Sequence, residues 1–243
     1  MTRPLCAIVG AGAGLGRALA AKFASRAFDL ALISRSETNS AAALEAAAAA
    51  DRAASVRFFP ADAIQTETLE SALATVEGEM GEIDLLIYNA RGDFAACEPL
   101  DMTYAALEEV HRVEVIGAFA AAKSVLPGMI KRSRGSVFFS SATAAFRGSS
   151  THPLYAIGKF GLRALSQSLS KAYAKNGVHV VHFRLDCDLD VPIMRELYGE
   201  KYDPAKLASP DDIAETYWLT YLQPNSAWSN EVEIRPHTET WTY

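Results

Sequence analysis

Short apolar runs alternate along the chain with longer segments of helical pattern. The runs predict strands at residues 5–9, 30–33, 56–59, 84–88, 136–140 and 178–183. The longer segments predict helices at residues 15–27, 41–50, 69–76, 104–126 and 155–175. Such alternation implies right-handed crossovers and a parallel sheet with helices on both faces. We therefore predict an α/β fold built on a doubly wound parallel sheet of about seven strands.

Composition places the chain among globular proteins. Half of its 243 residues are hydrophobic, and no linker or shift in composition divides them, so we expect one domain over residues 1–243. The formal charge of −6 without a basic stripe argues against a nucleic-acid partner. Cys6, Cys97 and Cys187 are widely spaced, which indicates neither disulfides nor zinc and favours a cytoplasmic location. We expect no signal peptide and no membrane span, because no uninterrupted apolar run is long enough.

A glycine-rich turn joins the first predicted strand to the first helix. Its sequence is Gly10-Ala-Gly-Ala-Gly14-Leu15-Gly16. At such a turn, missing side chains let backbone N–H groups and the helix N-terminus approach a pyrophosphate, as in Rossmann dinucleotide-binding folds. The alternative is a tight turn whose glycines serve only close packing of strand and helix. Its position after a strand and before a helix favours dinucleotide binding.

The end of the second strand indicates which dinucleotide is bound. A carboxylate there would bind the ribose 2′-hydroxyl of NAD, but the strand ends Ile33-Ser34-Arg35-Ser36. Arginine beside small hydroxyls can instead bind a 2′-phosphate through charge-assisted hydrogen bonds. We therefore predict Ser34 and Arg35 as cofactor-binding residues and NADP(H) in preference to NAD(H). The alternative is a solvated arginine at a strand end.

Tyr155 and Lys159 lie four residues apart in a predicted helix, so their side chains share one face. A nearby ammonium stabilises a phenolate and makes a tyrosine a better proton donor. Tyrosine and lysine at this spacing also occur by chance on many helices. The upstream glycine turn gives the pair its weight as a candidate catalytic site.

Together these motifs resemble the short-chain dehydrogenase/reductase family over nearly the whole chain. The segment from Val9 to Gly16 is similar to the family's TGxxxGxG loop, Asp62-Ala63 to its adenine-contacting pair, and Tyr88-Asn89-Ala90-Arg91 to its NNAG segment. Arg91 replaces the last glycine of that segment. The resemblance implies cofactor contacts from Gly10, Gly14, Leu15, Gly16, Asp62, Ala63, Asn89, Ala90, Tyr155 and Lys159. It also implies a homodimer or homotetramer that acts on a small molecule.

The same resemblance implies a carbonyl/alcohol oxidoreductase in which tyrosine transfers a proton, lysine activates it and a serine holds the substrate oxygen. Tyr155 and Lys159 match. The serine is expected about thirteen residues before the tyrosine, where the chain has Ala142. Ser141 and Thr143 flank it, and we expect one of them, in the first place Ser141, to supply the hydroxyl only if the strand end bulges by one residue.

Glu114 stands where the family places an asparagine in the long helix. Its spacing from apolar neighbours puts it on the face otherwise built for burial, and a buried carboxylate must be paired or protonated. One interpretation is that Glu114 holds a water or relays protons toward Lys159. The other is that it reaches a polar edge or an interface and pairs with a basic side chain.

The segment after the sixth strand departs further from the family. Leu185-Asp186 replaces a Pro-Gly pair, and the spacing of Asp186, Asp188 and Asp190 lacks the glycine and glutamate of a calcium loop, so we predict no metal site. Residues 190–210 occupy the place of the family's substrate lid. The apolar side chains of this segment are Met194, Leu197, Tyr198 and Tyr202. They suggest a small apolar substrate, although ordinary helix packing explains them equally well.

Two classes of function remain open. The first is an NADP(H)-dependent oxidoreductase with Tyr155 and Lys159 as its proton-transfer pair. The second is a cofactor-binding sensor or scaffold on the same fold that has lost catalysis, which Ala142, Glu114 and Arg91 favour.

Overall fold

A computed structural model describes residues 3–239 of the chain. Its seven strands form one parallel sheet in the order β3-β2-β1-β4-β5-β6-β7. The strands are β1 (Leu5–Val9), β2 (Asp29–Ser34), β3 (Val56–Pro60), β4 (Ile83–Tyr88), β5 (Gly135–Ala142), β6 (Val178–Leu185) and β7 (Glu231–Ile234). The predicted fold class is confirmed.

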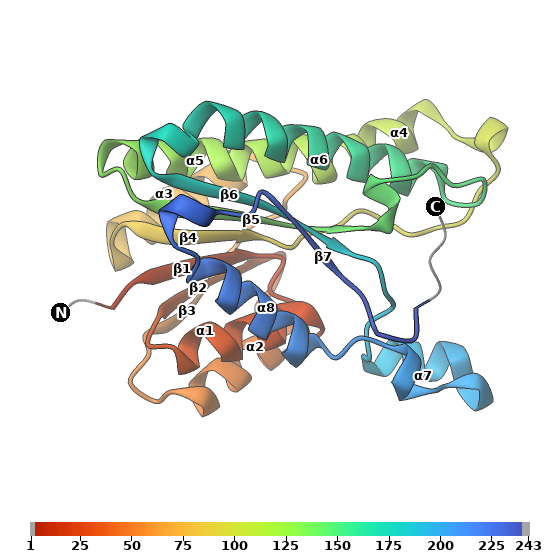
Figure 1. Ribbon diagram of the computed structural model, residues 1–243, viewed down its shortest axis with the longest axis horizontal. Coiled ribbons are helices and arrows are strands. Elements are labelled where there is room, and N and C mark those ends of the chain that lie inside the picture. The colour runs from red at the N-terminus through yellow and green to blue at the C-terminus, as the bar shows by residue number, and fades with distance from the viewer. Residues whose placement is uncertain (1–2, 240–243) are drawn as a thin grey trace.

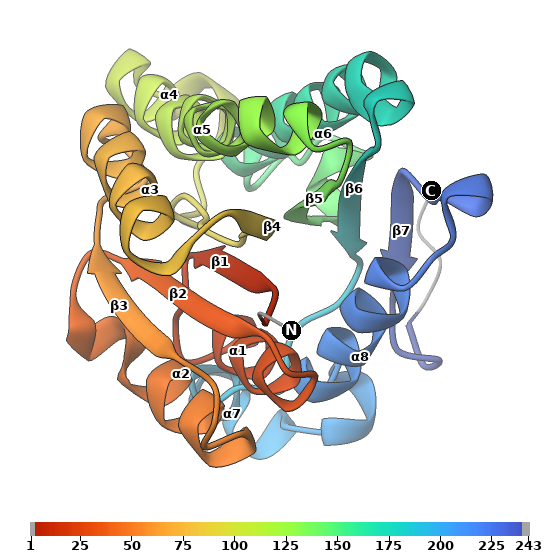
Figure 2. The same ribbon diagram turned by 90° about the vertical axis from the view of Figure 1, so that its left-hand side faces the viewer.

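Helices cover both faces of the sheet (Figures 1 and 2). One layer contains α3 (Thr66–Met80), α4 (Tyr104–His111), α5 (Ala118–Lys131) and α6 (Pro153–Tyr173). The other contains α1 (Leu15–Ser25), α2 (Glu37–Ala50) and α8 (Pro210–Tyr221), with the short α7 (Pro192–Tyr198) beyond them. Successive strand side chains alternate between the two layers, so each face of the sheet builds its own hydrophobic core.

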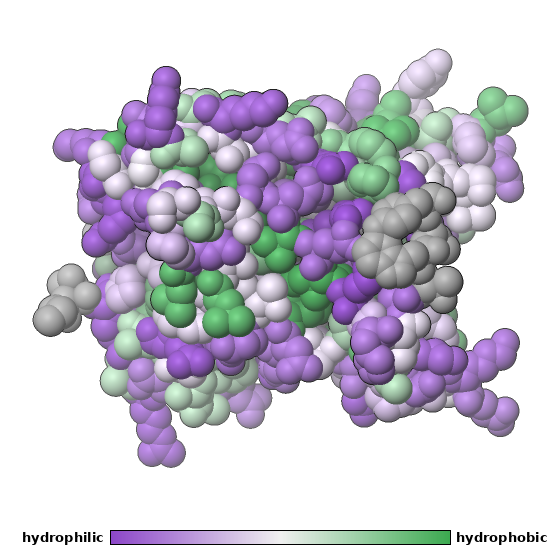
Figure 3. All heavy atoms as spheres, viewed as in Figure 1, coloured by the Kyte–Doolittle hydropathy of each residue, from purple (hydrophilic) through white to green (hydrophobic). Residues whose placement is uncertain are grey.

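The predicted elements are confirmed with small shifts at their ends, whereas the C-terminal elements were not predicted individually. β7 has only four residues and reads Glu-Val-Glu-Ile, too short a pattern to distinguish it from a loop. On the face shown in Figure 3, hydrophilic side chains predominate, and apolar ones gather over α8 and beside β7. Leu219 on α8 and Leu222, directly after it, are both more than half exposed.

The long predicted helix is interrupted by a π-helical segment, Arg112–Gly117, between α4 and α5. The wider turn leaves the carbonyl of Val113 free to accept a hydrogen bond of 2.5 Å from the Tyr88 hydroxyl. π-Helical turns inside α-helices occur frequently at functional sites. The continuous span Tyr104–Lys131 is the one helix in the described chain long and apolar enough to cross a membrane, and 56% of its apolar window is buried inside the protein.

Gly117 ends the π-helical segment where the helix crosses the loop after β3. A Cβ at this position would lie 2.2 Å from the Ala63 carbonyl oxygen and 2.7 Å from the Tyr88 hydroxyl. We therefore expect Gly117→Ala to lower the free energy of unfolding by about 1–3 kcal/mol, as overpacking does elsewhere. Urea denaturation measures this change in the free energy of unfolding. The control is Gly78→Ala in α3, where a Cβ meets nothing within 4 Å, and we expect no loss of stability there.

Candidate active site

The glycine turn combines tight packing with an open outer surface. Gly10 has φ 86° and donates its N–H to the Ile33 carbonyl at 2.9 Å, and a Cβ on it would lie 2.5 Å from the backbone nitrogen of Ala90. A Cβ on Gly16 would approach the backbone of Ala11 to 2.8 Å. By contrast, a Cβ on Gly12 would meet nothing within 4 Å. α1 begins at Leu15 without a side-chain cap, which leaves its first N–H groups for a ligand. These residues fit a pyrophosphate.

The end of β2 separates the roles of Ser34 and Arg35. The Ser34 hydroxyl donates to the Ser36 carbonyl and lies 2.8 Å from the Ser40 hydroxyl, so it is engaged within the protein. Ser36 caps α2 by accepting from the N–H of Asn39. Arg35 is exposed, and within residues 3–239 its guanidinium makes no ion pair or hydrogen bond. Arg35 is therefore the group at this edge that is free to bind an anion.

Asn89 links the ends of β1 and β4. Its backbone N–H donates to the Val9 carbonyl at 2.7 Å, and its side-chain amide donates to the Gly10 carbonyl at 2.9 Å. Asp62, after β3, accepts from the N–H of Ile64 at 3.1 Å. The predicted cofactor residues thus lie along the carboxyl ends of neighbouring strands, which is where open α/β sheets bind ligands.

Glu114 and Lys159 form a buried ion pair. Lys159 Nζ lies 2.8 Å from Glu114 Oε2, and the two side chains are 3% and 0% exposed. The other carboxylate oxygen of Glu114 accepts the backbone N–H of Gly92 at 2.8 Å. Gly158 makes room for this contact, since a Cβ there would lie 2.8 Å from Glu114 Cγ. Of the two interpretations left open by the sequence, the structure has Glu114 buried rather than at a polar edge, and its partner is the lysine of the candidate site.

The ion pair sits beside Tyr155. Lys159 Nζ lies 5.4 Å from the centre of the Tyr155 ring and 3.5 Å from the Ser140 carbonyl oxygen. Burial alone lowers the pKa of Lys159, but the Glu114 carboxylate and then Tyr155 raise it, so the net pKa lies above its ordinary value of 10.5. Arg91 acts weakly in the lowering direction. Lys159 is therefore a fixed positive charge at neutral pH, shared between Glu114 and the tyrosine.

The expected bulge at the end of β5 is not formed. β5 keeps a regular register with β6 from Gly135 through Ala142. Ser141 is buried, and its hydroxyl has no hydrogen-bond partner among the described residues. Thr143 begins a 3₁₀ turn just after the strand, where strand alternation no longer decides its direction, and its hydroxyl donates to Asp186. Thr143 therefore lines the pocket without a bulge, because the chain turns immediately after Ala142.

Tyr155 lines a pocket of about 540 Å³, together with Ala142 and Thr143. Ser141 is not among the residues of its wall. The ring of Phe94 meets Tyr155 edge to face at 4.9 Å between ring centres and stacks on His152 at 4.2 Å. Leu185, Asp186, Cys187 and Asp188 close the pocket from the end of β6. The pocket therefore lies at the carboxyl edge of the sheet, with Thr143 as a hydroxyl in the same wall as Tyr155.

The predicted lid segment lies outside the wall of this pocket. None of residues 190–210 lines the pocket. Leu197 is largely exposed, the Tyr198 hydroxyl donates to Asp188 at 2.5 Å, and the Tyr202 hydroxyl donates to Asp190 at 2.7 Å. The apolar substrate inferred from this segment therefore finds no support in the pocket wall. Residues 3–239 contain no cluster of three potential metal ligands.

Sequence reasoning missed Phe94, which lies in a loop after β4, and the charged pair behind Thr143. Arg235 lies 2.5 Å from the Asp186 carboxylate, and both side chains are 14% exposed. Arg235 follows β7, almost fifty residues after Asp186 in the chain. No local pattern signals such a contact, because only the pairing of β6 with β7 brings the two residues together.

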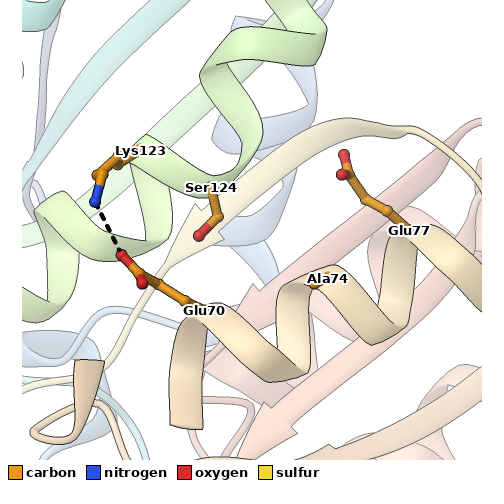
Figure 4. A pocket seen from close by; sticks show the side chains of 5 residues that line it. All are labelled: Glu70, Ala74, Glu77, Lys123 and Ser124. Atoms are coloured by element: carbon orange, nitrogen blue, oxygen red, sulfur yellow. Dashed lines mark hydrogen bonds and ion pairs between the residues drawn. The ribbon is translucent and has the colours of Figure 1, made fainter. Parts of the chain in front are cut away.

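A second, smaller hollow of about 270 Å³ lies between α3 and α5 (Figure 4). Glu70 and Lys123 pair across it at 3.4 Å, and Glu77 points toward it from the next turns of α3. Partial burial raises the pKa of Glu77. The hollow is far from the glycine turn and is explained by two helices packing side by side.

Comparison with known proteins agrees with this geometry. The family model for short chain dehydrogenases matches residues 5–186. An uncharacterized oxidoreductase of Staphylococcus aureus is 24% identical over 238 residues, covering 97% of this chain and 98% of that protein. Among solved structures, a short-chain dehydrogenase from Rhodopseudomonas palustris has a TM-score of 0.79 at 27% identity, covering 96% of this chain and 99% of that chain. A metagenomic short-chain oxidoreductase in complex with NADP has a TM-score of 0.83 at 20% identity, covering 98% of this chain and 99% of that chain.

The family model spans most of the chain, and the protein therefore belongs to the short-chain dehydrogenase family, a family of oxidoreductases. The resemblance drawn from the glycine turn and the Tyr155/Lys159 pair is confirmed at this level.

Proposed function

We propose that the protein is an NADP(H)-dependent oxidoreductase that interconverts a carbonyl and an alcohol on a small molecule. The observation that carries this proposal is the arrangement around Tyr155. Its ring lines the pocket, and the ammonium of Lys159 is fixed beside it by the buried carboxylate of Glu114. The glycine turn, Asp62 and Asn89 supply the matching surface for a dinucleotide at the same edge of the sheet.

In this proposal Tyr155 donates a proton to the substrate oxygen during reduction and accepts it during oxidation. The bound nicotinamide supplies or accepts the hydride. Lys159 on α6 stabilises the phenolate form of Tyr155, and Glu114, in the π-helical segment, is a positioning residue that holds the Lys159 ammonium in place. Thr143 is better placed than Ser141 to contact the substrate oxygen, because only Thr143 lines the pocket. The role of Ser141 in holding the substrate oxygen stays a prediction.

Arg35 is proposed to select NADP(H) by binding the 2′-phosphate. We expect Arg35→Glu to weaken NADPH binding by tenfold or more and NADH binding much less, because the change places a negative charge against a phosphate that NADH lacks. Fluorescence titration with both cofactors measures the two Kd values. Arg52→Glu, on an exposed turn after α2, is the control for a general charge effect. Equal losses for NADPH and NADH would remove Arg35 from this role.

The second candidate, a sensor or scaffold that binds the cofactor without turnover, is favoured by Ala142 in place of the family serine. Titration with NADPH, followed by a screen for turnover of ketones, aldehydes and alcohols, distinguishes the oxidoreductase from the sensor. Turnover supports the enzyme, while tight NADPH binding without turnover supports the sensor.

We further propose a homodimer or homotetramer in the cytoplasm. Phe119 on α5 and Ile157 and Phe160 on α6 are exposed apolar side chains on the long helices, which supports self-association. Light scattering on a size-exclusion column measures the mass.

A further inference from the structure

The wall of the pocket around Tyr155 is unusually polar. Small-molecule pockets are mostly lined by apolar side chains, with a few polar groups that fix orientation. Among residues 3–239, the apolar lining consists of Phe94, Leu185, Cys187, Gly148, the alanines Ala142 and Ala144, and the edges of polar residues. The polar groups come from three separate parts of the chain: residues 143–155, residues 186–188 and Glu239.

Several of these groups have hydrogen-bonding capacity that the protein does not use. Within the described chain, neither the Ser150 hydroxyl nor the Glu239 carboxylate makes a hydrogen bond through its side chain. His152 lies 3.0 Å from the Thr151 hydroxyl through Nδ1, which leaves Nε2 for a ligand. Water serves these groups in the open pocket. An apolar ligand would displace that water without replacing its hydrogen bonds, and each group left unpaired is costly.

The charged residues of the pocket wall indicate which class of polar ligand fits: a cation, an anion or a neutral molecule. The wall holds charges of both signs: Asp188 and Glu239 are acidic, Arg147 is basic, and Asp186 pairs with Arg235 at 2.5 Å. A cationic ligand would meet Arg147, and an anionic ligand would meet the two carboxylates. A hydroxyl group both donates and accepts hydrogen bonds, so a chain of hydroxyls can pair with the Glu239 carboxylate, the His152 imidazole and the Ser150 hydroxyl together.

We propose that the substrate is a polyhydroxylated alcohol or the corresponding ketone, with hydroxyl groups on the carbons beside the reacting one. Ser150, His152 and Glu239 are its specificity-determining residues. This inference rests on the proposed function, since it places the reacting carbon at Tyr155. It replaces the apolar substrate expected from the lid segment, which does not reach the pocket.

The test compares linear alcohols of equal length, because linear alcohols do not cyclise. Oxidation of a hexitol, of hexan-2-ol and of the cationic 6-aminohexan-2-ol is measured with NADP⁺. We expect kcat/KM for the best hexitol stereoisomer to exceed that for hexan-2-ol by about a hundredfold or more, because a site built to bind hydroxyls rejects an analogue without them. A higher kcat/KM for hexan-2-ol or for the amino alcohol would overturn the proposal.

Substitutions in the pocket wall test whether its residues cause the preference for the hexitol. Glu239→Gln and Ser150→Ala are each expected to reduce the ratio of the hexitol and hexan-2-ol kcat/KM values about tenfold, the effect of one lost hydrogen bond. Glu45→Gln, on the exposed face of α2 outside the pocket, is the matched control and should leave the ratio unchanged. An unchanged ratio in both wall variants would contradict the assignment.

Calorimetry separates this inference from the proposed function. If no alcohol is oxidised, the oxidoreductase proposal fails, but binding of hexitol and hexan-2-ol to the protein with NADP⁺ still tests the pocket. Hexitol binding that is weakened by Glu239→Gln supports the polyhydroxylated ligand. Binding of hexan-2-ol alone, or of neither alcohol, refutes it.

Discussion

Tyr155→Phe is expected to lower kcat for carbonyl reduction by about 100- to 10,000-fold, the range that general acid catalysis supplies. The substitution removes only the phenolic hydroxyl. The phenyl ring retains the edge contact with Phe94 at 4.9 Å and the position 5.4 Å from the Lys159 ammonium, so the fold and the pocket stay intact. Steady-state kinetics with NADPH and a saturating carbonyl substrate measures the loss, and NADPH fluorescence shows that the cofactor still binds.

Tyr173→Phe is the matched control, because Tyr173 lies at the far end of the same helix and outside the pocket. It should turn over substrate like the unmodified protein. A Tyr155→Phe protein as active as the Tyr173→Phe protein would exclude Tyr155 as the proton donor.

Glu114→Ala is expected to destabilise the protein by about 3–5 kcal/mol, because it leaves the Lys159 ammonium buried without its partner. The alanine also gives up the hydrogen bond to the N–H of Gly92. Urea denaturation measures the free energy of unfolding. The double variant Glu114→Ala/Lys159→Met removes both charges and should recover much of the loss. If the single effects simply add in the double variant, the two residues are not coupled.

The contribution of the Lys159 ammonium to this pair should be lost at high pH. The pKa of Lys159 is raised in the folded protein, by the Glu114 carboxylate against the opposing effect of burial. Stability from a raised lysine pKa is fully present below the ordinary value of 10.5 and is lost as the pH rises through the folded-state pKa. The difference between the unmodified protein and Glu114→Gln should therefore stay constant near neutral pH and narrow only in strongly alkaline solution.

The sequence was sufficient for the parts of this molecule that local patterns determine. The six predicted strands and the helices between them follow from hydrophobic runs and helical segments, and the glycine turn identifies the dinucleotide edge because its context is local. Helical periodicity also put Glu114 on the face built for burial, but it left open whether the carboxylate is buried or reaches a polar edge. Its direct contact with Lys159 depends on how α6 packs against the π-helical segment, and Gly158 is the residue that permits it.

Contacts between distant segments were beyond prediction. The Thr143 hydroxyl reaches Asp186, and Asp186 pairs with Arg235, only because β5, β6 and β7 lie side by side in the sheet. The direction of Thr143 was misjudged because alternation along a strand was extended past its last residue. The lid segment was assigned by analogy of position, and its tyrosines bind Asp188 and Asp190 on the protein itself.

The central claim is that this altered site still transfers hydride, with Tyr155 and the Glu114-held Lys159 in place although Ala142 replaces the usual serine. The most direct measurement uses NADPH that carries deuterium at the transferable position of the nicotinamide, incubated with polyhydroxylated and simple carbonyl compounds. We predict deuterium on the former carbonyl carbon of the product alcohol, and much less with Tyr155→Phe. Tight NADPH binding without transfer of deuterium to any of these compounds would contradict the account.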